Sequence, residues 1–121
     1  MSYDDKNIFV YFLRGEIPCK KIYEDDYVLS FHDINPQKKI HALVIPKGKY
    51  IDLDDFSENA SSEEMVGLLK GINIVAKKLK ISVDTGKGYR ALANISEDGG
   101  QEVPHLHFHL FGGEKIGKMV E

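Results

Sequence analysis

The chain has 121 residues, of which 42% are hydrophobic, and its 16 basic and 19 acidic residues give a formal net charge of −3. This length predicts a single domain over residues 1–121, with one core that buries roughly two-thirds of the surface of the unfolded chain. The acidic balance and the scattered lysines give no indication of a polyanion-binding surface, so we expect no nucleic-acid partner.

Cysteine content and the N-terminal sequence bear on the cellular compartment. Cys19 is the only cysteine, so neither an intramolecular disulfide nor a paired thiolate metal site can form. The first residues are acidic and lack the apolar segment of a signal peptide. No stretch approaches the roughly 20 apolar residues that span a bilayer. We therefore expect a soluble, cytoplasmic protein with no membrane partner.

The first third of the chain predicts a short helix followed by a hairpin. Apolar residues recur at helical spacing within residues 7–14, and Gly15 follows where a helix would end. Residues 21–24 and 27–32 have the composition of two strands, and a tight acidic turn joins them.

The middle of the chain predicts a central strand and one long helix. Residues 41–45 are almost continuously apolar and end at Pro46, which is typical of a strand that is covered on both faces. Between residues 61 and 80 the apolar residues form a helical stripe, and Ser61 and Glu64 have the spacing of a capping box.

The last third of the chain predicts two more strands on either side of a polar loop. Residues 88–94 alternate in polarity and deliver Asn94 to the end of a strand. The loop at residues 96–100 leads to a strand that begins at His105. About five strands, with two helices outside the regular β order, predict an α+β fold.

Three of the five histidines, His105, His107 and His109, occupy every second position near the C-terminus. On a strand this spacing places the three imidazoles on one face and the intervening apolar side chains on the other. Burying three imidazoles side by side costs desolvation free energy, and three protonated rings would repel one another. We therefore interpret the row as facing a ligand.

Three hypotheses account for such a row. Two neighbouring histidines on a strand can share a zinc ion, but His105 and His109 would lie roughly 13 Å apart, so a metal site would need a further ligand such as His41. In covalent catalysis the central imidazole attacks a phosphorus atom, and Gly99 and Gly100 free the preceding backbone to direct N–H groups at an anion. A nucleotide-binding module without turnover is the third hypothesis.

The sequence resembles the Hint branch of the histidine triad (HIT) superfamily, whose motif is His-x-His-x-His followed by hydrophobic positions, here residues 105–111. The resemblance includes residues 31–37, 41–47 and 88–90, and it covers residues 8–113. It implies a HIT-like α+β fold with a five-stranded antiparallel sheet, one long and one short helix, and a homodimer joined through the long helix and a strand. It also implies a hydrolase of purine nucleoside 5′-phosphoramidates, such as adenylate joined to lysine, that uses no cofactor and no metal.

The resemblance also implies a role for each catalytic residue. His107 would be the nucleophile that attacks the α-phosphorus and becomes a transient nucleotidyl-histidine. The backbone carbonyl of His105 and the side chain of His41 would hold the tautomer of His107. His109 would contact the α-phosphate and stabilise charge in the transition state. Asp33 would accept hydrogen bonds from the ribose hydroxyls.

The remaining expected site residues would surround the purine nucleotide. Those on the side of the phosphate and leaving group are Asn94, Gly100, Gln101 and Glu102. Those that would form the apolar slot for the base are Ile8, Phe9, Ile17, Phe31, His32, Ile34 and Leu43. Because Glu102 stands where some relatives have a small hydroxyl residue, we expect it to face a cationic or amine leaving group.

Two alternative functions remain compatible with the motif. The branch that cleaves dinucleoside polyphosphates uses the same central histidine, although Gly112 and Gly113 favour the Hint branch. A nucleotide-binding regulator would keep the site without hydrolysis. Some members of the family hold a structural zinc ion through N-terminal cysteines, but Asn7 and Val10 stand at the corresponding positions. We therefore expect no structural zinc site.

Overall fold

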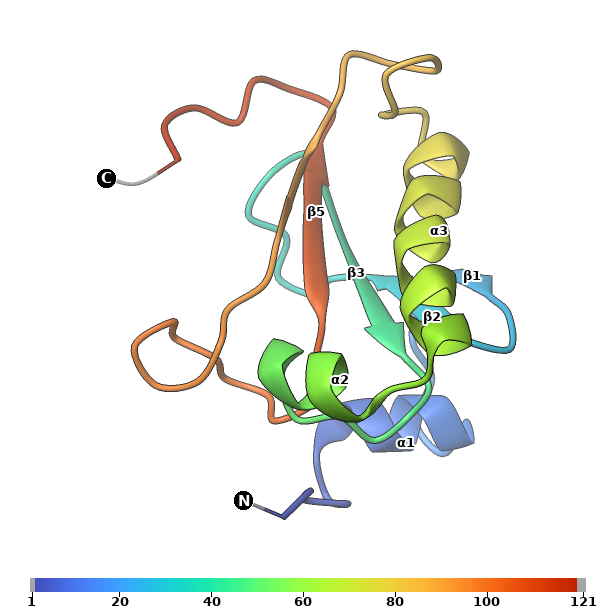
Figure 1. The fold of residues 1–121 in the computed structure, drawn as a ribbon. Helices are drawn as coiled ribbons and strands as arrows, with labels where there is room; N and C mark the ends of the chain where they lie inside the picture. The colour runs from blue at the N-terminus through green and yellow to red at the C-terminus, as the bar shows by residue number, and fades with distance from the viewer. Residues whose placement is uncertain (1, 120–121) are drawn as a thin grey trace.

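A computed structural model describes residues 2–119 as a five-stranded antiparallel sheet with three helices (Figure 1). The helices are α1 (Ile8–Arg14), α2 (Leu53–Asn59) and α3 (Ser62–Lys78). The strands are β1 (Lys21–Glu24), β2 (Val28–His32), β3 (Ile40–Pro46), β4 (Arg90–Leu92) and β5 (Phe108–Gly112). Their order across the sheet is β1-β2-β3-β5-β4. The predicted α+β class and five strands are confirmed.

Local sequence signals define the ends of α1. The side chain of Asn7 accepts hydrogen bonds from the backbone N–H groups of Phe9 and Val10, which have no partner inside the helix. Gly15 ends the helix in the left-handed conformation, with a φ of 74°, which glycine adopts at little cost. The predicted short helix is confirmed, with Asn7 as its cap.

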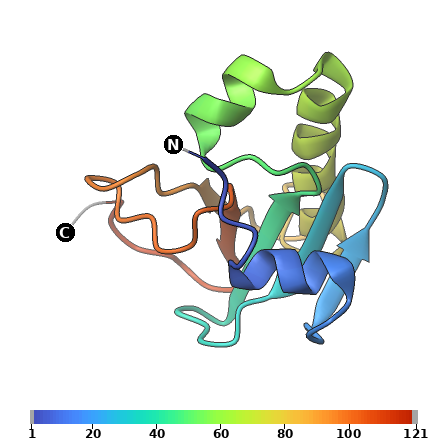
Figure 2. The same cartoon turned by 90° about the horizontal axis from the view of Figure 1, so that it is seen from below.

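The sheet is covered on both faces, as its central strand predicts. Side chains of β2 and β3 alternate between two apolar clusters. The cluster under α3 contains Val28, Ala42, Val44, Phe56, Leu68, Ile72, Val75, Leu106 and Leu110. The cluster on the opposite face, where α1 lies, contains Phe9, Leu29, Phe31, Leu43 and Ile45 (Figure 2). Covering of β3 on both faces explains its nearly continuous apolar sequence.

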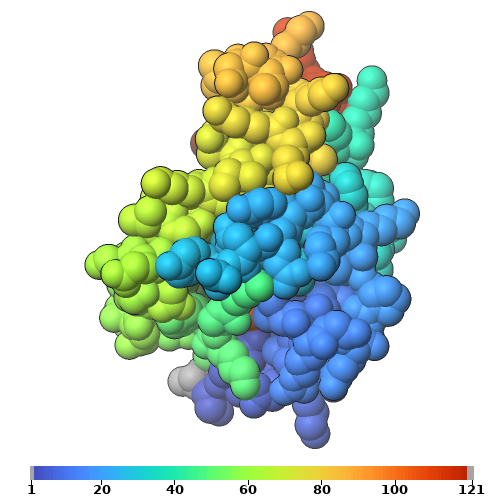
Figure 3. Space-filling model, turned by 90° about the vertical axis from the view of Figure 1, so that its right-hand side faces the viewer, coloured from blue at the N-terminus to red at the C-terminus, as the bar shows by residue number. Residues whose placement is uncertain are grey.

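Helix α3 begins and packs as predicted. Ser61 and Glu64 form the reciprocal hydrogen bonds of a capping box. At Gly71 the helix passes so close to β2 that an added Cβ atom would stand 2.8 Å from Cγ2 of Val28. The β1-β2 hairpin lies against this helix, as Figure 3 shows from the side. No helix within residues 2–119 is long and apolar enough to cross a membrane.

The prediction of only two helices is wrong, because α2 was missed. This helix has seven residues, begins at the cap Asp52 and buries only Phe56. One buried side chain gives no apolar periodicity to detect.

The histidine row does not form one continuous strand. Strand β5 begins at Phe108, so His105 and His107 precede it and only His109 belongs to it. In the register of β3 with β5, Pro46 would stand opposite Leu106, but a proline has no N–H group to continue the ladder. The backbone N–H of Leu106 donates instead to the carbonyl of Tyr50 at 2.8 Å. The prediction that the apolar residues between the histidines face the core is confirmed for Leu106 and Leu110, which are both buried.

Strand β4 is shorter than predicted. It ends at Leu92, two residues before Asn94, so Asn94 belongs to the loop that follows the strand.

Candidate functional site

A cavity of about 860 Å³ opens on the sheet face that carries α1. Its walls come from α1, β2, the turn before β3, β3 itself, the loop after β4 and the histidine segment. The catalytic candidates that line it are His41, His107 and His109. The nucleotide-binding candidates that line it are Ile8, Phe9, Phe31, His32, Asp33, Ile34, Leu43, Asn94, Gly100, Glu102, His107 and His109.

Three predicted site residues do not line the cavity: Ile17, Gln101 and His105. The side chain of Gln101 donates to the carbonyls of Ile51 at 2.6 Å and Val103 at 3.0 Å, and accepts from the N–H of Ser96. Gln101 therefore ties the loop after β4 to the rest of the molecule, rather than facing the cavity.

Sequence reasoning also missed part of the wall. The additional lining residues are Phe12, Pro18, Cys19, Lys20, Asn35, Gln37 and Val103. Phe12 follows Phe9 by one helical turn, so its place on the same face was detectable. The segment after Ile17 has no periodicity from which its orientation could be inferred.

The loop after β4 holds a shape that leaves backbone groups near the cavity. The side-chain amide of Asn94 donates to the carbonyl of Gly99 at 2.7 Å and closes the loop. Gly100 has a φ of 75°, a conformation that favours glycine. Asn94 and Gly100 both line the cavity.

His105 lies behind the cavity and is fully buried. Its Nε2 is 2.8 Å from the carbonyl oxygen of Pro46, and because a carbonyl only accepts, Nε2 carries the proton. Its Nδ1 accepts a hydrogen bond from the hydroxyl of Tyr3. Burial lowers the pKa of His105 to about 4, so the ring is neutral at physiological pH.

His107 lines the cavity and is 7% exposed. Its Nδ1 donates to the backbone carbonyl of His105 at 2.7 Å, which is the contact expected from the sequence. A neutral imidazole carries one proton, so Nε2 keeps a free electron pair. Burial lowers the pKa of His107, while the carboxylates of Asp33 and Glu102 oppose that shift. The edge of the ring packs against Phe9, with ring centres 5.0 Å apart.

His41 holds His109, not His107 as expected. The backbone N–H of Gln37 donates to Nδ1 of His41 at 3.1 Å, so the proton of His41 is on Nε2. That nitrogen is 2.9 Å from Nδ1 of His109 and donates to it. The proton of neutral His109 is therefore on its Nε2. Burial lowers the pKa of both rings, that of His109 to about 4.

One group among residues 2–119 has donor atoms placed for a metal ion, namely Asp33, His41 and His109, all within 4.8 Å of one another. The hydrogen bonds of His41 argue against that use. With Nδ1 accepting from the N–H of Gln37, a metal on Nε2 would require either loss of that bond or a doubly deprotonated ring. The geometry favours a relay of hydrogen bonds from Gln37 through His41 to His109.

Together these features define a small α+β protein with a partly apolar cavity in which His41, His107 and His109 have tautomers fixed by hydrogen bonds. The model of the HIT domain family matches residues 14–116. The chain belongs to the HIT domain family.

Relatives and solved structures agree with this assignment. A HIT-like protein of Azospirillum brasilense is 50% identical over 119 residues, which cover 98% of this chain and 95% of that protein. A histidine triad protein from Clostridium difficile superposes with a TM-score of 0.80 at 40% identity, covering 98% of each chain. A HIT family hydrolase from Clostridium thermocellum gives a TM-score of 0.85 at 34% identity, covering 98% of this chain and 99% of the other.

Proposed function

We propose that this protein is a HIT family hydrolase that cleaves purine nucleoside 5′-phosphoramidates through a covalent nucleotidyl-histidine. The observation that carries the proposal is the hydrogen bond from Nδ1 of His107 to the carbonyl of His105, which leaves Nε2 as a free nucleophile on a ring that lines the cavity. Similarity to the Clostridium thermocellum hydrolase supports hydrolysis as the reaction class.

The proposed reaction has two displacements at phosphorus. In the first, Nε2 of His107 forms a bond to the α-phosphorus, and the P–N bond of the substrate breaks as the amine leaves with its electron pair and takes up a proton from water. In the second, a water molecule attacks the same phosphorus and gives up a proton to the solvent, the P–Nε2 bond breaks with its electron pair returning to Nε2, and the nucleoside monophosphate is released. The carbonyl of His105 accepts from Nδ1 throughout and stabilises the positive charge that develops on the ring.

His109 supports the same reaction from the other side of the phosphate. Because His41 fixes the proton of His109 on Nε2, that nitrogen is a donor for a phosphate oxygen. The N–H groups of Gly99, Gly100 and Gln101 already donate to carbonyls within the loop, so the loop shapes this wall of the cavity but these three groups do not serve as donors to the phosphate. We place the ribose at Asp33, and the base between the apolar walls that include Phe9 and Leu43.

The test is release of adenylate from an adenosine 5′-phosphoramidate of lysine in the presence of EDTA. The variants are His107→Ala and His107→Asn. The amide introduced by the second variant can still donate to the carbonyl of His105, but it is not a nucleophile. We expect release by the intact protein in EDTA and loss of release in both variants, with thermal unfolding of His107→Asn close to that of the intact protein.

Other outcomes would replace the proposal. Inhibition by EDTA would instead support a metal-dependent mechanism, with Asp33, His41 and His109 as the candidate ligands. Cleavage of a dinucleoside polyphosphate without cleavage of the phosphoramidate would assign the protein to the alternative enzyme class. Adenylate binding without release from either substrate would indicate a nucleotide-binding regulator.

We further propose that Glu102 selects amine leaving groups that carry a positive charge. Its exposed side chain lines the cavity, close enough for the carboxylate to oppose the lowering of the pKa of His107. In Glu102→Ser we expect the preference for a lysine leaving group over a neutral amine to fall by roughly twofold to fivefold, the size of an exposed ion-pair interaction. An unchanged preference, measured as the ratio of kcat/KM values, would contradict this role.

We also propose that two copies pair through α3 and the edge strand β4. Val66 and Leu69 project from α3 with exposed fractions of 51% and 68%, and β4 has a neighbour on one side only. We expect a dimeric mass by light scattering, and a monomeric mass for the Val66→Glu, Leu69→Glu double variant. Val83→Glu changes an equally apolar side chain that is 88% exposed outside α3, and this control remains dimeric. A monomeric intact protein would refute the pairing.

A further inference from the structure

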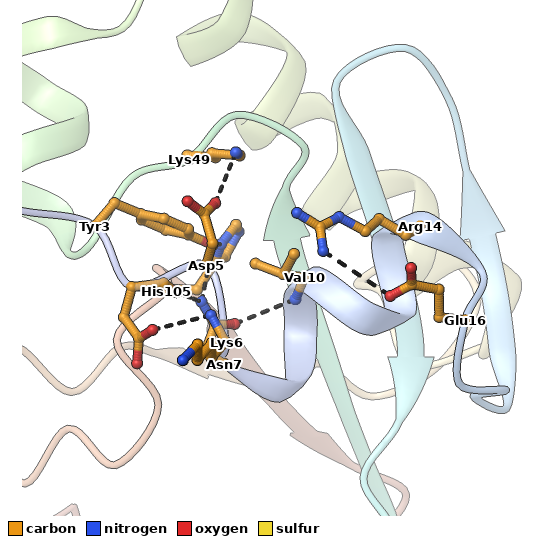
Figure 4. A network of polar contacts seen from close by, with 10 residues as sticks. Tyr3, Asp5, Lys6, Asn7, Val10, Arg14, Glu16, Lys49 and His105 are labelled. Carbon is orange, nitrogen blue, oxygen red and sulfur yellow. Dashed lines mark hydrogen bonds and ion pairs between the residues drawn. The ribbon is translucent and has the colours of Figure 1, made fainter.

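The segment before α1 reaches the back of the histidine row. Figure 4 shows Tyr3 and Asn7 beside His105, with the side chain of Tyr3 directed at its ring. The hydroxyl of Tyr3 contacts Nδ1 of His105, and the side-chain amide of Asn7 donates to that hydroxyl at 3.0 Å. Residues 102 positions apart are thereby joined at a buried imidazole.

The direction of each hydrogen bond follows from the groups involved. The single ring proton of His105 is on Nε2, which donates to the carbonyl of Pro46, so Nδ1 has only an electron pair to offer. The hydroxyl of Tyr3 must therefore donate to Nδ1, and it can accept from Asn7 at the same time. The chain of donors runs from Asn7 to Tyr3 to His105, and it ends at Pro46.

This chain bears on the nucleophile through the backbone. The residue whose ring is held between Tyr3 and Pro46 is also the residue whose carbonyl accepts from Nδ1 of His107 at 2.7 Å. A His105 ring that rotated, or that carried its proton on Nδ1 instead of Nε2, would lose its bond to Pro46. Because the ring is fully buried, that loss would leave polar groups unpaired and favour a shift of the local backbone. The alignment of that carbonyl therefore depends on both ends of the ring being bonded.

We propose that Tyr3 is a positioning residue for the reaction: its hydroxyl fixes the ring of His105, and through the carbonyl of His105 it holds His107 in the tautomer and orientation that attack phosphorus. This role rests on the proposed function of His107. It predicts an effect on the chemical step rather than on substrate binding, because Tyr3 does not line the cavity.

Asn7 links the hydroxyl of Tyr3 to the first turn of α1. The oxygen of its side chain caps α1 through the N–H groups of Phe9 and Val10, and its nitrogen donates to Tyr3. Phe9, in the first turn of α1, packs edge-on against both His105 and His107. The start of α1 therefore packs directly against the histidine row. Tyr3 contacts the same row through His105 and does not line the cavity.

The test compares Tyr3→Phe with Tyr11→Phe. Both changes remove one phenolic hydroxyl from the N-terminal part of the chain, and within residues 2–119 Tyr11 has no side-chain hydrogen bond whereas Tyr3 does. For Tyr3→Phe we expect kcat to fall by roughly tenfold, as for a small misplacement of a reacting group, with KM changed less than about twofold. Tyr11→Phe keeps the kcat of the intact protein.

NMR of the imidazole nitrogens distinguishes a positioning role of Tyr3 from a purely structural one, because only the positioning role changes the nitrogen signals of His105 and the proton exchange of His107. In the intact protein we expect His105 to show a single Nε2–H tautomer with a hydrogen-bonded Nδ1, and His107 to show a slowly exchanging Nδ1–H. In Tyr3→Phe the Nδ1 signal of His105 moves toward that of a free nitrogen, and exchange of the His107 proton accelerates. These spectra decide the positioning role even if the intact protein fails to cleave a phosphoramidate, which would refute the proposed function alone.

Two results would overturn the inference. One is a kcat for Tyr3→Phe equal to that of the intact protein. The other is a loss of kcat without any change in the nitrogen spectra of His105 and His107, because the hydroxyl would then act on folding and not on the tautomer.

Discussion

Acidification should destabilise this protein through His105. Its pKa is about 4 in the folded protein, against an ordinary value of 6.5, and burial is the main cause. Between these two values the unfolded chain binds a proton that the folded chain does not. The contribution of the neutral His105 ring to the free energy of unfolding is therefore fully present above pH 6.5 and falls as the pH decreases toward 4. From these pKa values the loss between pH 7 and pH 5 is about 2 kcal/mol from this side chain alone.

The assay is urea unfolding at pH 7, 6 and 5 at constant ionic strength, for the intact protein and for His105→Gln. The glutamine amide of the variant can still donate to the carbonyl of Pro46, but it does not titrate. We expect a lower free energy of unfolding for the variant at pH 7 and a smaller decrease on acidification, by about 2 kcal/mol. Carboxylates titrate equally in both proteins and cancel. Equal decreases in the two proteins would refute the assignment of a neutral, buried His105.

Three further predictions follow from single contacts. His41→Ala leaves Nδ1 of His109 without its donor, and we expect kcat to fall by roughly tenfold to a hundredfold in adenylate release; an unchanged kcat would exclude the relay. Gly71→Ala forces a Cβ against Val28 and should lower the free energy of unfolding in urea by about 1–3 kcal/mol; a stabilised variant would contradict the close approach. Ser61→Ala removes a helix cap and should cost about 1 kcal/mol in the same assay, whereas no loss would show that the cap is dispensable.

Elements with local signals could be predicted from the sequence, and elements set by distant contacts could not. Asn7 with Gly15, and Ser61 with Glu64, mark helix ends within a few residues of the chain. The interruption of the histidine strand depends on Pro46, which meets that segment only through the register of the sheet. No pattern within residues 105–110 could reveal it.

The same distinction applies to the site. The alternate spacing of the motif correctly predicted that His107 and His109 lie at one cavity. It failed for His105, which precedes β5 and lies behind the cavity. The partner of His41 could not be inferred, since it depends on how β3 and β5 align. Gln101 was expected at the phosphate, but its side chain is held by the carbonyls of Ile51 and Val103, a contact that only the folded chain creates.

The environments of the histidines bear on how an anion would be held. His105 and His109 have pKa values of about 4, and those of His41 and His107 are also lowered. The ring N–H groups of His41, His105 and His107 already donate within the protein, so a phosphate would meet the Nε2–H of a neutral His109 rather than a positive charge. The electron pair on Nε2 of His107 remains available, which protonation would remove. An anion beside His109 would in turn favour its charged form and raise its pKa. Nucleotide binding should therefore offset the lowering of the His109 pKa that burial causes.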